Sequence, residues 1–162
     1  MARTMPKQKP GKSEQVVCTP MEFVVAAERR LVTHFYIDLA ALDVNKVCSF
    51  HIGPAEDSLA ADWRRKIPIG RWAWLNPPYS KIGPWMKKAY QSGRLIAVLV
   101  PASVGSNWWR DYVHEKAWVN FLNGRIQFVG HKAGYPKDLA LIVYGLEPGY
   151  DIWTWKTKKE KR

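Results

Sequence analysis

The chain of 162 residues carries 25 Lys and Arg against 14 Asp and Glu, a formal net charge of +11, and 47% of its residues are hydrophobic. This composition excludes a disordered chain, and two cysteines, Cys18 and Cys48, are too few for a disulfide scaffold. No apolar run approaches the roughly 18 residues of a membrane helix, and no signal peptide is evident at the start. We therefore expect a soluble, cytoplasmic protein, and its basic balance makes a polyanion the first partner to consider.

Much of the positive charge lies at the two ends of the chain. Residues 1–14 hold four basic side chains against one acidic one, and residues 156–162 hold five against one, so the ends supply seven of the eleven net charges. We interpret both ends as flexible tails that flank a single domain over residues 15–155. Such tails serve either to keep a chain soluble or to attract phosphate without sequence preference.

The first predicted element is a helix from Pro20 to about Leu31. Thr19 is a suitable N-cap, Pro20 suits the first helical position, and Glu22 completes a capping box. The short apolar run Phe35–Leu39 follows and predicts a buried strand.

Residues 47–91 predict further short elements. Two more strands are expected, and the second stops at a pair of prolines, which neither a strand nor a helix interior tolerates. An amphipathic helix follows, with apolar side chains at i, i+3, i+4 and i+7. In chain order the predictions are a strand over Val47–Ile52, helical turns over Glu56–Trp63, a polar loop over Arg64–Gly70, a strand over Trp72–Leu75 and a helix over Ile82–Gln91.

The last third of the chain is the richest in strands. Its first run is continuously apolar, as a central parallel strand is, and the dipeptide Asn123-Gly124 is a strong signal for a two-residue hairpin turn. The expected elements are a strand over Leu95–Val100, a helix over Ser106–Glu115 capped by Ser106 or Asn107, hairpin strands over Trp118–Leu122 and Arg125–Val129, and a last strand over Leu139–Tyr144.

The order of these elements predicts the fold class. Strands and helices alternate up to about residue 115, and strands dominate afterwards. This pattern is typical of an α/β protein with a mostly parallel sheet and an antiparallel C-terminal hairpin. Such sheets bind ligands at the carboxyl ends of their strands, where Asp38 and Asn76 are expected.

The tetrapeptide Asn76-Pro77-Pro78-Tyr79 is the feature most suggestive of chemistry. Two prolines restrict the backbone, so the side-chain oxygen of Asn76 and the carbonyl of Pro77 can converge as two acceptors on one small volume. Two acceptors suit an exocyclic NH₂ group, whose nitrogen lone pair is then directed at an electrophile. Tyr79 offers a ring on which a base stacks, worth about 1–3 kcal/mol, and an amino nitrogen in duplex DNA is reached only when the base is flipped out.

Other short motifs surround this tetrapeptide in a particular order. They are Thr19-Pro20, Ile37–Ala41, Glu56–Leu59 with Trp63, Asn76–Tyr79 with Trp85 and Lys88-Ala89, Leu99–Ala102, and Gly124–Phe128. In this order and spacing the chain resembles the phage-type DNA N6-adenine methyltransferase (Dam) family. The resemblance covers about residues 17–145, and the tetrapeptide is its most specific part.

The resemblance implies a single Rossmann-like methyltransferase domain, S-adenosylmethionine as cofactor and adenine N6 in double-stranded DNA as acceptor. It implies direct in-line transfer from sulfonium to nitrogen, and relatives suggest GATC as the target. The catalytic residues it implies are Asn76, Pro77, Pro78 and Tyr79. The cofactor-binding residues it implies are Thr19, Pro20, Asp38, Ala40, Asp57 and Asn76.

The chain departs from the family pattern at two positions. No glycine-rich G-x-G loop follows the first strand, where Leu39-Ala40-Ala41 stands instead, and Ser58 occupies a position where glycine is usual in the family. No separate target-recognition domain is evident, so loops are expected to supply specificity: those from Ile82 onward, over Ser103–Trp109 or at Asn123-Gly124.

Four side chains are candidates for contact with DNA. Arg125 suits phosphate or a guanine edge, although a solvated arginine in a hairpin is equally common. Arg64 and Arg65 suit phosphate, although such a basic run is more often a solvated loop. Trp108 or its neighbour Trp109 suits stacking, while at least one of the two is expected in the core. The four histidines have no metal-ligand spacing, and we assign no metal.

Two alternatives remain open from the residues. The same tetrapeptide suits cytosine N4 or a protein glutamine amide as acceptor. A protein that only binds DNA and keeps a methyltransferase fold accounts for the charge, although binding alone has no need for two converging acceptors.

The distribution of charge leads to a prediction about the tails. Removal of residues 1–14 and 156–162 should weaken DNA binding and flatten its salt dependence, while methyl transfer at saturating DNA is retained. Titrations at several salt concentrations, with turnover measured in parallel, check this. Abolished turnover would make the tails part of the site.

Overall fold

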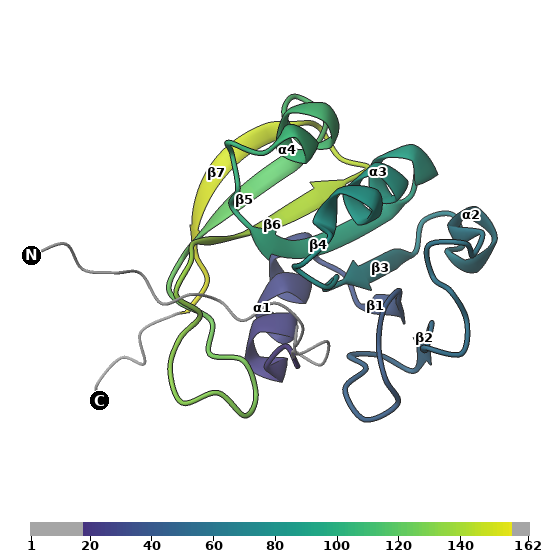
Figure 1. Ribbon diagram of the computed structural model, residues 1–162, viewed down its shortest axis with the longest axis horizontal. Helices are drawn as coiled ribbons and strands as arrows, with labels where there is room; N and C mark the ends of the chain where they lie inside the picture. The colour runs from purple at the N-terminus through teal and green to yellow at the C-terminus, as the bar shows by residue number, and fades with distance from the viewer. Residues whose placement is uncertain (1–17, 157–162) are drawn as a thin grey trace, which may run out of the picture.

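Seven strands form one continuous sheet in the part of the chain that the structure describes, residues 18–156 of a computed structural model (Figure 1). Apart from Lys156, both predicted tails lie outside these residues. The strands are β1 (Phe35–Asp38), β2 (Phe50–His51), β3 (Trp72–Leu75), β4 (Leu95–Pro101), β5 (Trp118–Asn123), β6 (Leu139–Tyr144) and β7 (Gly149–Thr154). Four helices accompany them within the same residues: α1 (Met21–Leu31), α2 (Trp63–Lys66), α3 (Ile82–Ser92) and α4 (Asn107–Tyr112).

The strand order across the sheet is β2-β1-β3-β4-β6-β5-β7. The first four strands pair in parallel, β6 is antiparallel to both β4 and β5, and β7 is parallel to β5. Among the described strands β6 alone therefore runs against the rest. This arrangement confirms the predicted α/β class, a mostly parallel, Rossmann-like sheet with an antiparallel pair near the C-terminus.

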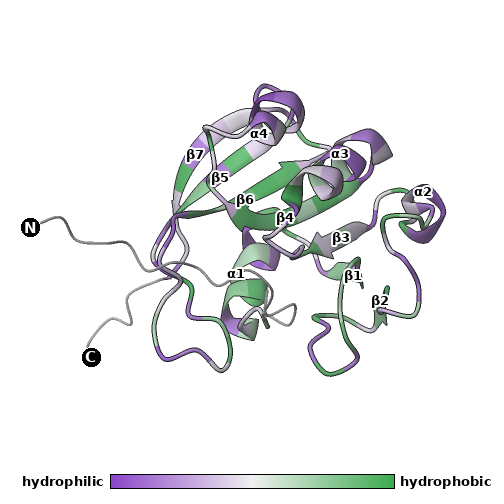
Figure 2. Ribbon diagram, in the orientation of Figure 1, coloured by the Kyte–Doolittle hydropathy of each residue, from purple (hydrophilic) through white to green (hydrophobic). Residues whose placement is uncertain are grey.

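Helices cover both faces of the sheet. α1 lies on one face, and α2, α3 and α4 lie on the other (Figure 1). Alternate side chains of β4 divide between the two layers: Ile96 and Val98 pack toward α3 and α4, whereas Ala97 and Leu99 pack toward α1. All four are fully buried, as expected of an apolar strand covered on both faces (Figure 2). Within residues 18–156, no helix has the length and apolarity needed to span a bilayer.

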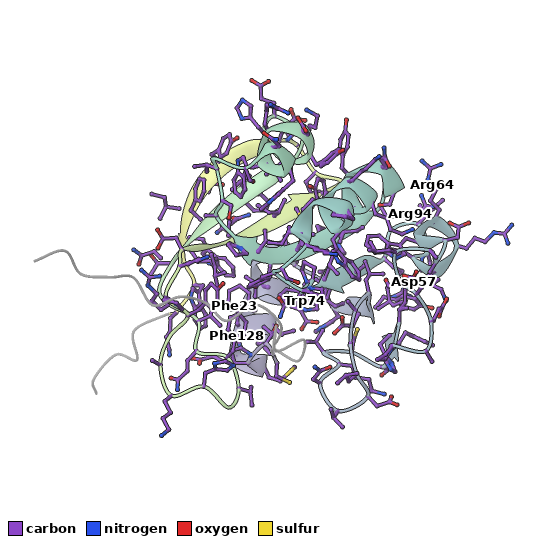
Figure 3. The ribbon with its side chains drawn as sticks, in the orientation of Figure 1. Phe23, Asp57, Arg64, Trp74, Arg94 and Phe128 are labelled. Atoms are coloured by element: carbon purple, nitrogen blue, oxygen red, sulfur yellow. The ribbon has the colours of Figure 1, made fainter. Side chains whose placement is uncertain are left out.

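Aromatic rings dominate the core on the α1 face. Phe23 of α1 lies edge-on to Trp74 of β3, with ring centroids 6.2 Å apart, and edge-on to Trp155 at 5.1 Å. Phe128, from the segment after β5, is buried in the same cluster. Figure 3 shows Phe23, Trp74 and Phe128 gathered around α1. The segment after β5 is therefore held against α1.

A buried polar contact holds the C-terminal end of α1 on the sheet. Nε of Arg30 donates to Oδ1 of Asn120 at 2.6 Å, and Asn120 is fully buried in β5. The Arg30 guanidinium also lies over the rings of Trp118 and Trp153, about 5 Å from each centroid. Because a buried amide left without a partner costs about 1–3 kcal/mol, this contact fixes α1 over β5.

The start of α1 differs from the predicted capping box. Pro20 is the N-cap, and its carbonyl accepts from the backbone nitrogens of Phe23 and Val24. No side chain caps the helix, because Pro20 has no side-chain acceptor and Thr19 lies one residue before the N-cap position, where its hydroxyl accepts a hydrogen bond from Asn76. The predicted Thr19 cap is therefore wrong.

The segment between β2 and β3 also differs from prediction. The helical turns predicted over Glu56–Trp63 are present as one hydrogen-bonded turn, in which the backbone nitrogens of Ala60 and Ala61 donate to the carbonyl of Asp57. The helix α2 follows and takes up the start of the polar loop predicted over Arg64–Gly70, because the Asp62 carboxylate caps it by accepting from the backbone nitrogens of Arg64 and Arg65. The strand predicted over Val47–Ile52 is reduced to the two residues of β2.

No hairpin forms at Asn123-Gly124. Both edges of β5 are occupied, by β6 on one side and β7 on the other, so a strand over Arg125–Val129 has no edge to pair with. Gly124 has a positive φ of 116°, but its carbonyl accepts from Nε1 of Trp155, and an irregular loop follows to Asp138. The antiparallel end of the sheet is formed by β6 instead, and the last strand is β7, which was not predicted.

One strained residue offers a test of the fold. Val32, the C-cap of α1, has φ of 52° and ψ of 51° and is 90% exposed. A β-branched side chain is disfavoured in this left-handed region, so Val32→Gly should raise the free energy of unfolding by about 1 kcal/mol in chemical denaturation.

The matched control is Val44→Gly. Val44 is 86% exposed, and among the described non-glycine residues only Val32 and Glu115 have positive φ. Here glycine should destabilise the protein, by up to about 1 kcal/mol, through the entropy of the unfolded chain. Equal effects at both positions would contradict the strain at Val32.

Candidate functional site

The strand order reverses between β1 and β3. The chain leaves β1 toward β2 on one side, and β3 and β4 extend the sheet on the other. In α/β sheets, ligands bind in the crevice outside the carboxyl ends of the strands at such a switch point. Asp38 ends β1 and is in register with Trp74, so Asn76, just after β3, lies at the same edge. The structure thus brings together the two strand-end residues that the sequence singled out.

A bulge in β1 sets the direction in which Asp38 points. The register with β3 shifts between Phe35 and Ile37, and these residues pack into cores on opposite faces of the sheet. In a regular strand, residues two apart share a face, so the bulge reverses the alternation that follows it. Asp38 consequently faces the α1 side, where its charge acts on the thiol of Cys18.

The Asp38 carboxylate is buried at this edge. Asp38 is 3% exposed, and its two oxygens accept from the backbone nitrogens of Ala40 and Val47, both at 3.2 Å. Burial raises the pKa of Asp38 to about 6, and these hydrogen bonds offset it only in part. Burial, and then the Asp38 charge, also raise the pKa of Cys18 and Cys48. A bound cation is the ligand that would stabilise this carboxylate.

Asn76 is held by a hydrogen bond from outside its own strand. Its Nδ2 donates to Oγ1 of Thr19 at 3.1 Å, and Thr19 is 7% exposed. Because the amide nitrogen faces Thr19, the orientation of the amide is fixed, with Oδ1 on the other side and shielded from solvent. A carbonyl-type acceptor is therefore fixed at the carboxyl end of β3.

Tyr79 is held by both its hydroxyl and its ring. The hydroxyl donates to the carbonyl of Leu99 in β4 at 3.2 Å, and the ring lies edge-on to Tyr135, with centroids 5.7 Å apart. Burial raises the pKa of Tyr79 well above its usual value, so the phenol remains a protonated donor. Pro77 is buried and Pro78 half-buried, and their rings restrict the turn that precedes Tyr79.

The segment around Asp57 is tied to the end of β1. Ser58 is buried, and its hydroxyl donates to the carbonyl of Leu39 and accepts from Nε1 of Trp63. Asp57 itself is exposed, and its carboxylate accepts from the backbone nitrogen of Leu59. Ser58 thus makes two hydrogen bonds, which fix the segment that carries Asp57.

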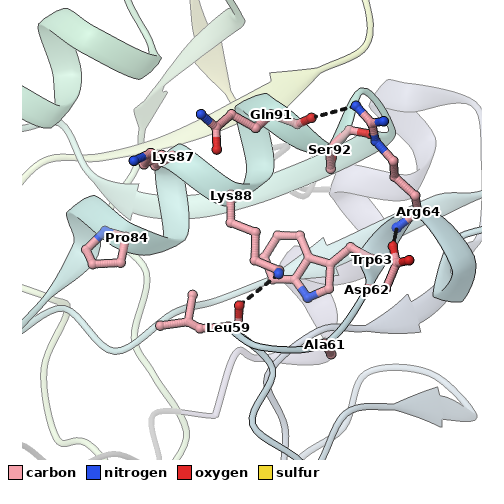
Figure 4. Close-up of a pocket in the computed structure, with 10 residues that line it drawn as sticks. All are labelled: Leu59, Ala61, Asp62, Trp63, Arg64, Pro84, Lys87, Lys88, Gln91 and Ser92. Carbon is pink, nitrogen blue, oxygen red and sulfur yellow. Dashed lines mark hydrogen bonds between the residues drawn. The ribbon is translucent and has the colours of Figure 1, made fainter.

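A pocket of about 400 Å³ lies between α3 and the segment that contains α2 (Figure 4). Lys88 of α3 spans it, with Nζ donating to the carbonyl of Leu59 at 2.8 Å. Arg64 donates to the carbonyls of Gln91 and Ser92, the last two of α3. The Arg64 guanidinium is therefore engaged in the fold, and its contact with DNA stays a prediction.

The other two candidate arginines lie on separate parts of the sheet. Arg65, in α2 beside the β2 edge, is exposed and lies 3.6 Å from the Asp62 carboxylate. Arg125, after β5 in the other half of the sheet, donates to the carbonyl of Tyr135 and lies 3.4 Å from the Asp138 carboxylate. The structure does not bring these arginines together, and their roles stay predictions.

Of the two adjacent tryptophans in α4, one faces the core as predicted. Trp109 is 3% exposed and stacks on Phe121 with centroids 6.1 Å apart. Trp108 is half-buried, and its ring centroid lies 5.7 Å from that of Trp109. Trp108 therefore stays the candidate of the pair for contact with DNA.

Tyr135 reaches the site although no sequence pattern singles it out. It lies in the irregular loop over residues 124–138 and packs against Tyr79. Gly124, Gly130 and Gly134 mark this region as a loop in the sequence, but a glycine pattern does not reveal which aromatic side chain turns inward. The predicted hairpin also hid the loop, because it assigned residues 125–129 to a strand.

Comparison with known proteins points to one family. The model of the DNA N-6-adenine-methyltransferase (Dam) family matches residues 8–141. A DNA N-6-adenine-methyltransferase of Haemophilus phage HP1 is 30% identical, and the match covers 83% of this chain and 78% of that protein. A DNA N-6-adenine-methyltransferase of Escherichia phage T1 is 27% identical over 74% of this chain, which spans only 56% of that protein. The matched region includes both strand ends of the crevice and the whole tetrapeptide.

The raised pKa of Asp38 predicts a pH-dependent stability. Between its ordinary value of 3.8 and about 6 the folded protein binds more protons than the unfolded chain. The free energy of unfolding should therefore rise as the pH falls through this window, and the gain is lost again above about 6. Relative to Asp38→Asn, which lacks this titration, the wild type should gain about 2 kcal/mol between pH 7.5 and pH 4.5.

Denaturant titrations of both proteins across this range measure the difference. Acidic groups common to both proteins cancel in the comparison. A difference that stays constant with pH would show that Asp38 titrates normally in the folded state.

Proposed function

The chain belongs to the DNA N-6-adenine-methyltransferase (Dam) family, and on this basis we propose that it transfers a methyl group from S-adenosylmethionine to N6 of adenine in double-stranded DNA. The observation that carries the proposal is the hydrogen bond from Asn76 to Thr19 at the switch point of the sheet. It orients the amide of a tetrapeptide suited to holding an amino group. Residues 15–155 then form a single methyltransferase domain.

The amino group of adenine explains why the site needs two acceptors. In the proposed complex the two N6 protons are held by Oδ1 of Asn76 and the carbonyl oxygen of Pro77. The nitrogen lone pair, which is otherwise delocalised into the ring, then points out of the base plane toward the methyl donor. The ring of Tyr79 supports the base, and its hydroxyl is anchored to the carbonyl of Leu99.

The residues at the β1 end fit a cationic nucleoside cofactor. When bound, S-adenosylmethionine supplies an activated methyl group on a sulfonium, and it carries an ammonium as well. The buried carboxylate of Asp38 is a suitable counter-charge, because its own desolvation is relieved by a nearby cation. Thr19, Pro20 and Ala40 would line this part of the site, and the exposed Asp57 would meet the adenine edge of the cofactor.

The missing G-x-G loop is consistent with this placement. The backbone nitrogen of Leu39 donates to the carbonyl of Trp74, and that of Ala41 donates to Ile52. The nitrogen of Ala40 is held by Asp38. Since these three backbone N–H groups already donate within the fold, we propose that side-chain charge, rather than backbone donors, is the main means of holding the cofactor.

The proposed role of the protein in the reaction is to orient the two reactants. In-line transfer from sulfonium to nitrogen needs no nucleophile from the chain, and alignment of the two reactants accounts for most of the rate. As charge moves from sulfur to N6, the two oxygens that accept the N6 protons stabilise the developing positive charge. The proposed catalytic residues are thus Asn76, Pro77 and Tyr79, with Pro78 restricting the turn.

Double-stranded DNA is the proposed partner. The net charge of +11 favours a polyanion, and Arg65, Arg125 and Trp108 are the proposed contacts that remain accessible. A GATC target stays a prediction to be checked by mapping methylated positions. The phage origin of the relatives supports a bacterial host cytoplasm as the place of action.

The test is incubation with S-adenosylmethionine and PCR-amplified DNA, followed by mass spectrometry of the nucleosides. We expect N6-methyladenine, and Asn76→Ala should lower kcat by about 100-fold or more, because this variant lacks one of the two charge-stabilising acceptors. Gln91→Ala, at an exposed position in the last turn of α3, is the matched control and should retain activity.

The alternatives give different products in the same assay. N4-methylcytosine would identify cytosine as the acceptor, and methyl transfer to an added protein in place of DNA would identify a protein amide. Failure to form any product on varied DNA, with the cofactor bound and the fold intact, would leave a protein that only binds DNA.

A further inference from the structure

The loop over residues 124–138 is irregular but firmly held at its base. It contains no helix or strand, yet Ile126 and Phe128 are 0% and 2% exposed and pack in the α1-face core. The backbone nitrogen of Tyr135 donates to the carbonyl of Ile126 at 2.7 Å, and Arg125 donates to the carbonyl of Tyr135 at 3.2 Å. The loop therefore returns on itself and holds Tyr135 in one place. Figure 1 shows it descending beside α1.

Tyr135 is the contact from this loop to the end of the tetrapeptide. Its ring meets that of Tyr79 at an interplanar angle of 74°, and on another side it meets Phe128 at 5.7 Å and 83°. The hydroxyl of Tyr79 is fixed to the Leu99 carbonyl, but this single hydrogen bond still lets the ring tilt. The edge contact with Tyr135 restricts this tilt.

A second contact runs from the loop to the start of the tetrapeptide. The backbone nitrogen of Val129 donates to the carbonyl of Cys18 at 3.1 Å. The next residue, Thr19, accepts the hydrogen bond that orients Asn76. The loop therefore contacts Tyr79, the last residue of the tetrapeptide, directly, and it is linked to Asn76, the first residue, through the segment that carries Thr19.

The outer part of the loop is exposed and basic. Val129 is 59% exposed, and Lys132 and Lys137 are exposed as well. The turn that carries them has a defined shape, because a Cβ at Gly134 would lie 2.8 Å from Cβ of Arg125. Exposed lysines on a defined turn suit the phosphates of DNA.

We propose that the 124–138 loop positions the tetrapeptide on bound DNA, and that Tyr135 is the positioning residue acting on Tyr79. This inference rests on the proposed function. The lysines of the loop bind phosphates beside the target base. The base of the loop meanwhile keeps the Tyr79 ring at the angle on which the flipped adenine stacks, and Tyr135 acts through Tyr79 without touching the adenine.

The proposal predicts a loss in rate more than in affinity. In-line transfer is sensitive to small displacements of the acceptor, so a tilted Tyr79 ring should lower kcat by about 10- to 100-fold. The phosphate contacts do not involve Tyr135, so the KM for DNA should change by less than about threefold. A residue that only stabilised the fold would change neither parameter once the protein is folded.

The experiment is steady-state methylation of PCR-amplified DNA by wild type, Tyr135→Ala, Tyr135→Leu and Tyr135→Phe. Alanine and leucine should both lower kcat, because neither presents a ring edge, and leucine largely fills the space and guards against loss of the fold. Phenylalanine keeps the ring and should retain kcat. Tyr112→Ala is the matched control. Tyr112 is half-buried, and its carbonyl accepts from Tyr144, which is in register with Ile96 at the start of β4 and so lies at the opposite end of the strands from the tetrapeptide.

The lysines are tested separately. The double variant Lys132→Gln, Lys137→Gln should raise the KM for DNA and lower its salt slope by about one for each phosphate that the loop no longer binds. An unchanged slope would overturn the binding of DNA by the loop.

The remaining outcomes also decide the proposal. If Tyr135→Ala and Tyr135→Leu keep the wild-type kcat, or if Tyr135→Phe loses as much as alanine, the positioning role of the Tyr135 ring is wrong, while the proposed function stands. If wild type forms no methylated product on the same DNA, the proposed function fails and this inference falls with it.

Discussion

The pairing of β1 with β3 is the constraint on which the rest of the site depends. β1 has four residues, and its register with β3 is reset by a bulge between Phe35 and Ile37. That shift turns Asp38 toward α1, and it sets Asp38 at the same sheet edge as Asn76. Without it, a carboxylate would face the α3 layer and the cofactor side of the crevice would lose its charge. One extra residue in a short strand therefore decides which side of the sheet carries the chemistry.

The segment Cys18–Pro20 joins the two halves of the crevice. It lies close enough to Asp38 for the carboxylate to act on the Cys18 thiol, and its Thr19 hydroxyl orients Asn76. In the proposed reaction these two groups serve different reactants, the cationic donor and the amino acceptor. The same three residues then lead directly into α1. The geometry between donor and acceptor thus depends on how this helix sits on the sheet.

Much of the fold was predictable because its strands are apolar runs bounded by strong signals. Leu95–Val100 and Trp72–Leu75 follow from their continuous apolar sequence and from the prolines after them, and the strand before the tetrapeptide correctly placed Asn76 at the carboxyl end of β3. The errors arose where a local signal lost to a tertiary contact. Thr19 is a good N-cap in isolation, but Pro20 occupies the N-cap position and the Thr19 hydroxyl faces Asn76 instead. Asn123-Gly124 is a good hairpin turn, but β5 already has two neighbours.

Two features were beyond the sequence for a different reason. β7 has side chains that are mostly exposed, so it lacks the alternation of buried and exposed positions that marks a strand. Tyr135 is one of seven tyrosines, and only the return of its loop brings it to Tyr79. Both depend on contacts between residues distant in the chain, which a local pattern does not contain.

The attachment of α1 at both of its ends has a consequence for the stability of the site. The helix is fastened at its C-terminal end by Arg30 to the buried Asn120, and the residue just before its N-cap, Thr19, is fastened to Asn76. The helix therefore links β5, in one half of the sheet, to the carboxyl end of β3, in the other. Displacement of its N-terminal end would remove Thr19 from Asn76, and with it the hydrogen bond that orients the amide. The packing of α1 on the sheet and the orientation of the Asn76 amide are therefore coupled through a single hydrogen bond.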